Sequence, residues 1–133
     1  MKLEQAIHAR WAASAALCAL LPAERFATGL AHAAEVPYAT LARRPGRTLF
    51  RTNAGDALDE IPLEIHVWHD EFDAAQAIAH EVKAAFDRGA FTLGDGGRVL
   101  RMLRAGESVV EHADGLWQWT IAFSLHVHLP SGY

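Results

Sequence analysis

The sequence contains little cysteine, no excess of basic residues and no long hydrophobic run. The single cysteine, Cys18, cannot form an internal disulfide, which argues against a disulfide-built secreted scaffold. The net charge of −4 argues against a protein that grips nucleic acid, because such proteins usually present a basic face. No apolar run reaches the roughly 18 residues that a membrane span needs. These absences leave a globular domain whose role must be sought in its packing and its surface.

The chain has 133 residues, of which 51% are hydrophobic. This length is typical of one domain, and this share of hydrophobic residues is enough to bury a single core. The sequence has no internal repeat, no low-complexity tract and no linker-like stretch. We therefore expect one domain that spans residues 1–133.

The N-terminal segment allows two interpretations, a secretory signal or a first helix. Its apolar run, residues 11–21, and the later Ala31-His32-Ala33 fit a signal peptide and its cleavage site. The basic charge that a signal needs before this run is weak, because Lys2 is offset by Glu4. We therefore favour a helix over residues 2–21, ended by Pro22 and followed by a small-residue connection to residue 35. Its apolar stripe comprises Leu3, Ile7, Trp11, Ala15, Cys18 and Leu21, which makes Cys18 a core residue without a redox role.

The first half of the remaining chain reads as strands. Residues 36–43 predict a short strand, and residues 44–57 predict a long hairpin or a mobile loop. Residues 58–69 alternate cleanly and predict a half-buried strand. Ile61, Leu63, Ile65 and Val67 take one face of this strand, whereas Glu64, His66 and Trp68 take the other.

A second helix and two strands follow. The helix is expected from an N-cap at Asp70 to Arg88, with Gly89 as its C-terminal cap. Its buried stripe is Phe72, Ala75, Ile78, Ala79, Val82, Ala85 and Phe86. Residues 94–97 predict a turn. Residues 99–112 predict a strand with a bulge at Gly106, joined by a two-residue Asp114-Gly115 turn to a strand over residues 116–129.

This order of elements indicates an α+β fold, an antiparallel sheet with two main helices packed on one face. The other face of the sheet is semi-polar and carries Trp68 and several histidines. We expect Trp68 to be exposed unless a partner covers it, or to pack within the chain at a sheet edge. Surfaces of this kind often contact a partner.

The search for reactive chemistry returns little. His126 and His128 share a strand face, and His66 would join them if the two strands pair, so these three are candidate zinc ligands. No carboxylate or cysteine lies at a ligand-like spacing beside them, and we favour no metal and no cofactor. No serine stands in a nucleophile motif, and the acidic groups suit helix capping or solvent. We therefore expect a protein without catalytic residues, not an enzyme.

The succession of elements resembles a known family. The pieces that carry this resemblance are Pro37-Tyr38, the segment from Ile65-His66-Val67-Trp68 into the alanine-rich helix, and the Asp114-Gly115-Leu116-Trp117 hairpin. Together they are similar to the tail-completion, or tail-terminator, proteins of long-tailed bacteriophages and of phage-derived gene transfer agents. The resemblance covers nearly the whole chain.

The resemblance implies a structural virion protein that forms a hexameric ring, without catalysis or cofactor. Such a ring caps the tail tube and joins it to the head-side connector or stopper, and DNA passes through its lumen without sequence-specific binding. We expect assembly in the bacterial cytoplasm, a place in the tail or neck of the particle, and no contact with a membrane. The projecting loops would be residues 44–57 and 92–97. The expected interface residues are Arg47, Leu49, Phe50, Arg51, Asn53, Trp68, Leu93, Asp95 and Arg98.

Two other functions stay open from the sequence. The protein could be another ring of the neck, a head-completion or stopper protein, because these share the size and the α+β character. It could also be a small metal-binding domain built on the three histidines named above. A secreted protein is the remaining reading of the N-terminal segment.

Overall fold

A computed structural model describes residues 2–29 and 35–131. Its centre is a seven-stranded sheet in the order β1-β2-β4-β7-β6-β5, with β3 paired to β4 beside β2. Only β1 and β2 run parallel, and the other pairs are antiparallel. The strands are β1 (Phe26–Thr28), β2 (Tyr38–Arg43), β3 (Arg47–Arg51), β4 (Ala57–His69), β5 (Gly89–Thr92), β6 (Arg98–Glu111) and β7 (Trp117–Leu129).

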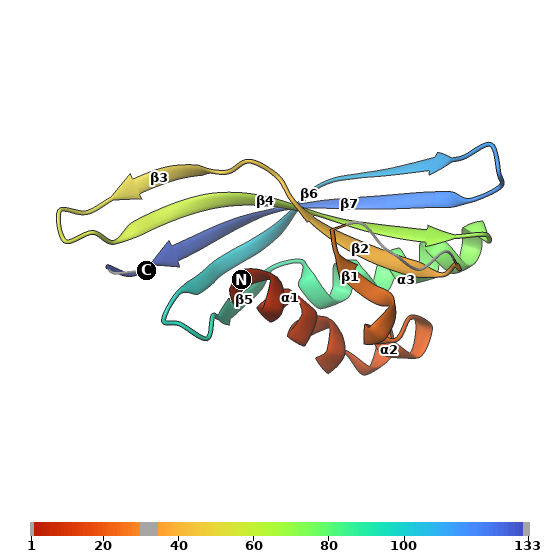
Figure 1. Ribbon diagram of the computed structural model, residues 1–133, viewed down its shortest axis with the longest axis horizontal. Helices are drawn as coiled ribbons and strands as arrows, with labels where there is room; N and C mark the ends of the chain where they lie inside the picture. The colour runs from red at the N-terminus through yellow and green to blue at the C-terminus, as the bar shows by residue number, and fades with distance from the viewer. Residues whose placement is uncertain (1, 30–34, 132–133) are drawn as a thin grey trace.

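The hydrophobic core lies between the sheet and the helices. The alternation expected for β4 is confirmed, since Ile61, Leu63, Ile65 and Val67 are all buried. On β7 the buried set is Trp119, Ile121, Phe123, Leu125 and Val127. Figure 1 shows α1, α2 and α3 on the same side of the sheet, where these side chains point. No helix of the described residues covers the opposite face of the sheet (Figure 1).

The helices differ in part from the expected pair. They are α1 (Lys2–Ala13), α2 (Ala15–Leu20) and α3 (Phe72–Phe86), with a 3-10 turn, η1 (Ala23–Arg25). The helix α3 lies directly against β4, β6 and β7, whereas α1 and α2 lie beside α3. The coarse prediction, a mostly antiparallel sheet with helices, is confirmed. The short strands β1 and β5 were not predicted.

The N-terminal segment is helical, as expected, but a single helix over residues 2–21 is wrong. Ser14 interrupts it and caps α2, because its Oγ accepts a hydrogen bond from the Leu17 amide at 3.2 Å. The break changes the helical phase, so Leu17 is buried in the core while Cys18 is only half-buried. The chain leaves the helix at Leu21, just before Pro22, as predicted. The Ala31-His32-Ala33 stretch lies outside the described residues.

The ends of α3 also differ from expectation. Its N-cap is Glu71, without a side-chain capping bond, and not Asp70. The helix ends at Phe86, and Arg88, not Gly89, takes the left-handed conformation with φ 65°. Gly89 is required for another reason: a Cβ there would lie 2.9 Å from the Phe86 carbonyl oxygen. Phe72, expected inside, is partly exposed and packs edge-on against Trp117.

The two hairpins answer one open question and correct one expectation. Residues 44–57 form a hairpin, with β3 paired to β4 and a turn at residues 52–55. The expected two-residue Asp114-Gly115 turn between β6 and β7 is wrong. The His112 amide donates to the Leu116 carbonyl oxygen at 2.8 Å, so the loop has three residues, 113–115, with Gly115 at φ 85°. The register of β6 with β7 shifts between Arg104 and Gly106, as expected, and also between Val99 and Arg101. No helix within the described ranges is long and apolar enough to cross a membrane.

Candidate functional site

One end of the sheet gathers two hairpin tips and the end of β7, and we call it the loop end. Residues 52–56 join β3 to β4, and residues 93–97 join β5 to β6. Arg98 pairs with His128 and Ala57 pairs with Leu129, both near the end of β7, which brings both tips to the same end. The Ser131 amide donates to Asp56 Oδ1 at 2.7 Å and ties the chain after β7 to the first of these tips. The β6–β7 hairpin reaches out at the opposite end of the molecule (Figure 1).

The strand β3 is exposed along its whole length. Phe50 is 65% exposed and Leu49 is 38% exposed, which places two neighbouring large apolar side chains on the surface. Arg47 contacts Glu60 on β4 at 3.1 Å, and Thr48 donates to Asp59 Oδ1 at 2.9 Å. These two contacts hold the strand against β4 while its apolar side chains stay uncovered.

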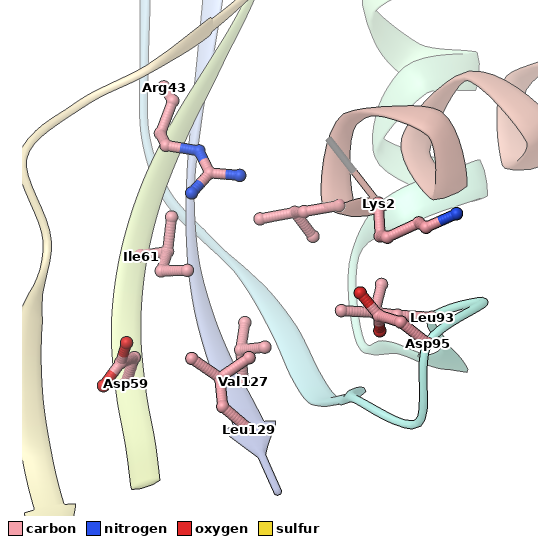
Figure 2. Close-up of a pocket in the computed structure, with 9 residues that line it drawn as sticks. Lys2, Arg43, Asp59, Ile61, Leu93, Asp95, Val127 and Leu129 are labelled. Atoms are coloured by element: carbon pink, nitrogen blue, oxygen red, sulfur yellow. The ribbon is translucent and has the colours of Figure 1, made fainter. Parts of the chain in front are cut away.

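A hollow of about 300 Å³ opens on the helix side of the loop end. Figure 2 shows side chains from α1, β2, β4, β7 and the β5–β6 turn converging on it. Its apolar lining is Leu3, Ile61, Leu93, Val127 and Leu129, and its charged lining is Lys2, Arg43, Asp59 and Asp95. Such a surface suits an apolar side chain of a partner, held by charges at the rim.

An ion pair braces this hollow. The Arg43 guanidinium donates to both carboxylate oxygens of Glu4, at 2.7 and 2.8 Å, and Glu4 is 9% exposed. Burial by itself raises the pKa of Glu4, but the hydrogen bonds and charge of Arg43 outweigh it and hold the pKa below its ordinary value. Glu4 therefore stays ionised and fixes α1 to β2. Nothing in this arrangement supplies a nucleophile beside a base.

Seven of the nine expected interface residues lie exposed at the loop end: Arg47, Leu49, Phe50, Arg51, Asn53, Asp95 and Arg98. Leu93 lies there too, but it is 5% exposed and belongs to the core. Its backbone is in the β5–β6 turn, where the sequence suggested an outward loop, yet its side chain turns inward. Leu93 is thus unsuited to direct contact in this conformation.

Trp68 lies at the opposite end of β4 and is not the open platform that its strand phase suggested. It is half-buried between Tyr38, at a ring-centroid distance of 6.0 Å, and His112, at 5.4 Å. Part of its ring is therefore covered by the chain itself. Of the two expectations for Trp68, packing within the chain near a sheet edge is the one that fits this stack.

The structure does not bring the three candidate metal ligands together. His66 pairs with Thr120, whereas His126 pairs with Glu60, six residues away along β4. Six residues of strand span about 20 Å, so His66 cannot share an ion with His126 and His128. The described part of the chain contains no group of three or more histidine, cysteine or acidic side chains placed to hold a metal. The three-histidine hypothesis is therefore wrong in its geometry.

Two features of β6 were missed from the sequence. Val109 and Val110 are both exposed, although consecutive residues of a strand point to opposite faces of the sheet. Glu107 forms a cluster with the Trp119 indole nitrogen at 2.6 Å, Lys83 at 3.1 Å and Arg104 at 3.5 Å. The two adjacent valines are a sequence signal from which an open edge could have been predicted. The partners of Glu107 could not have been predicted, because they come from distant positions in the chain.

The comparisons with known proteins identify one family and one shared fold. Residues 5–128 match the family described as "Tail completion protein gp17". A chain in the solved virion of a native gene transfer agent particle shares the fold, with a TM-score of 0.72 and 15% sequence identity. The similarity covers 96% of each chain. No curated protein sequence matches this one.

Proposed function

The chain belongs to the family of tail completion protein gp17, a family of structural virion proteins, and from this premise we propose that it ends the tail tube. In this proposal the whole chain acts as one domain, and several copies form a ring that closes the tube and joins it to the head-side connector or stopper. The observation that carries the proposal is the family match over residues 5–128. The loop end, with exposed Phe50 and two projecting tips, supports a role in assembly.

The proposed partners are further copies of this chain, the tail tube protein and the head-side connector. A hexameric ring is the expected assembly, because the family resemblance implies it. Linear DNA would pass through the lumen without sequence-specific contacts, which the net charge of −4 favours. The protein would then reside in the tail or neck of a phage or phage-like particle.

The proposed contact surface is the exposed set at the loop end. Asn53 and Asp95 lie in the two tips, where they can reach a partner stacked along the tail. The hollow beside Arg43 would accept an apolar side chain from such a partner. Trp68, at the other end, is proposed as a second contact through the part of its ring that Tyr38 and His112 leave uncovered.

Loss of the gene tests the proposal. Particles made without the protein should carry tails of uncontrolled length, and supplying the full chain should restore one length. Electron micrographs of the particles measure both. Free tails of normal length beside filled heads would overturn termination and favour another neck ring, a head-completion or stopper protein.

A further inference from the structure

Two strand edges of the sheet have no strand beside them among the described residues. The strand β5 pairs with β6 only as far as Met102, and the Arg104 amide donates to Asp87 Oδ1 at 2.9 Å. Beyond that point residues 105–111 of β6 are exposed along the side away from β7. On the other side of the sheet, β3 pairs only with β4 and leaves its outer edge uncovered. Each copy therefore offers two different edges on opposite sides.

The backbone of residues 105–111 is arranged to receive another strand. The His112 amide donates to Leu116, and the register between β6 and β7 is continuous from Gly106 to Glu111. Backbone bonds in an antiparallel ladder alternate, so the amides and carbonyls of Val109 and Glu111 turn away from β7. A row of such groups on an exposed edge is a template for a further strand.

Both edges also expose two consecutive apolar residues. Val109 and Val110 are 41% and 48% exposed on β6, and Leu49 and Phe50 occupy the corresponding place on β3. Consecutive residues of a regular strand face opposite sides of the sheet, so the β6 edge has one valine above and one below. On β3 the register shifts between Thr48 and Phe50, so Leu49 lies at a bulge beside the exposed Phe50. A strand added to either edge would cover apolar surface.

The charges of the two edges are opposite. Residues 44–56 contain three arginines and one aspartate, whereas residues 104–114 contain three acidic residues and one arginine. Arg44, Arg47 and Glu107 form ion pairs within the subunit. Arg51 on β3 and Glu111 on β6 form no ion pair among the described residues, and they give the two edges their opposite charges. If two copies paired their 105–111 edges antiparallel about Val109, Glu107 would lie opposite Glu111 of the second copy. Like charges directly opposite one another destabilise a sheet, so like edges repel and unlike edges attract.

We propose that residues 105–111 of one copy pair with β3 of a second copy, so that the sheet continues from subunit to subunit. Pairing of two different surfaces is head-to-tail, and it yields a closed ring when the rotation between neighbours closes. This inference rests on the proposed ring and assigns the interface that closes it. The β6 edge of each copy is thus covered by β3 of one neighbour, and its β3 edge is covered by β6 of the other neighbour.

A proline at position 109 tests the backbone pairing. Val109→Pro removes an amide that makes no bond to β7, so the fold of the single subunit should survive while ring formation is lost. Val109→Ala is the matched control, because it keeps the amide, and it should form rings like the unchanged protein. Electron microscopy and mass measurement, on the full chain with tail tubes that lack it, report the rings. Circular dichroism reports the fold.

A charge exchange and a cross-link test the partner. Arg51→Glu and Glu111→Arg should each abolish rings, and the double variant should restore them, because every copy supplies both edges. In a Cys18→Ser background, Leu49→Cys with Val110→Cys should give a ladder of covalent oligomers with a short bismaleimide. Leu49→Cys with Gln76→Cys, on the exposed side of α3, is the control and should give none.

Each outcome separates the interface from the ring itself. Rings that persist in Val109→Pro and in both single charge variants would overturn the edge pairing and leave the proposed function standing. Failure of the unchanged protein to form rings on tubes would overturn the proposed function. If Val109→Pro does not fold, the charge exchange and the cross-link decide. Covalent dimers joined only through like edges would also overturn the inference.

Discussion

Single side chains hold distant elements of this molecule together at partly buried polar clusters. Glu107 on β6 accepts hydrogen bonds from Lys83 on α3 and from Trp119 on β7. Burial of Glu107 by itself raises its pKa, but the bonds from Trp119 and Lys83, with the charge of Arg104, hold the pKa below the ordinary 4.5. The ionised form is therefore the one that stabilises the fold.

Replacement of Glu107 by Gln should lower the free energy of unfolding at pH 7 by about 1 kcal/mol, because a charge-assisted hydrogen bond becomes a neutral one. The folded-state pKa lies below the unfolded value, so the contribution is complete above pH 4.5 and is lost as the pH falls through the folded-state pKa. Urea unfolding at pH 7 and at lower pH measures it. Glu81→Gln, on α3, is the control. Equal stability of Glu107→Gln and the unchanged protein at pH 7 would contradict the prediction.

His66 on the open face of β4 should titrate below its ordinary pKa of 6.5. Burial lowers the pKa, and the nearby Glu64, at 3.3 Å, only partly opposes this. The neutral ring contacts the Thr120 hydroxyl at 2.9 Å. The unfolded chain takes up this proton at higher pH, so stability should decrease as the pH falls below 6.5 and level off below the folded-state pKa.

An NMR titration of the imidazole signals measures the His66 pKa directly. His66→Gln should remove one signal and make the loss of stability between pH 7 and the folded-state pKa smaller. A His66 signal that titrates at or above 6.5 would show that Glu64 outweighs burial.

The hairpin β3–β4 depends on a close approach of two backbones. A Cβ on Gly46 would lie 2.5 Å from the Glu60 carbonyl oxygen, so only glycine lets β3 begin its pairing with β4. Glycine at such a position serves contact distance, not a left-handed conformation. The strand that exposes Leu49 and Phe50 therefore depends on a glycine at position 46, just before it begins.

Gly46→Ala should destabilise the hairpin, at a cost of about 1–3 kcal/mol, because the backbone of β3 must move away from β4. Hydrogen exchange of the β3 and β4 amides, together with the melting temperature, measures this. Gly94→Ala is the matched control, because a Cβ there meets nothing within 4 Å. If both variants behave alike, contact at Gly46 is not what limits the position.

The charge of the entire molecule bears on its proposed place around a DNA channel. Negative protein charge repels phosphate, and tight non-specific binding needs many released counterions from basic contacts. The arginines near residues 98–104 are a local exception within a net charge of −4.

The protein should therefore not retain duplex DNA at physiological salt. Electrophoretic mobility of a DNA fragment with added protein measures this, and a variant with Asp95 and Asp114 changed to Lys serves as the comparison expected to bind more. Retention that falls steeply with rising salt would contradict the prediction and assign a DNA-gripping role to the arginines.

Local patterns in the sequence determined the strands β4 and β7 and the helix α3. Their apolar periodicity is complete within a short stretch of chain, so it needs no knowledge of neighbours. The succession of elements also indicated the family. The capping residue of α3 and the break at Ser14 were not predicted correctly. One side chain that competes for a backbone amide can shift the end of a helix by one or two residues.

Only the tertiary structure decided which residues meet. The register of β4 with β7 separates His66 from His126, whereas the alternation of either strand alone allowed both to share a site. Leu93 lies in a turn between two strands, and its burial depends on the core that distant parts of the chain build together. The edges of β3 and β6 are open because the pairing of β5 with β6 stops at Met102 and β3 pairs only with β4. Local sequence does not specify which strands pair when they lie far apart in the chain. Periodicity gives each strand its two faces, but register and strand order determine which surface remains for a partner.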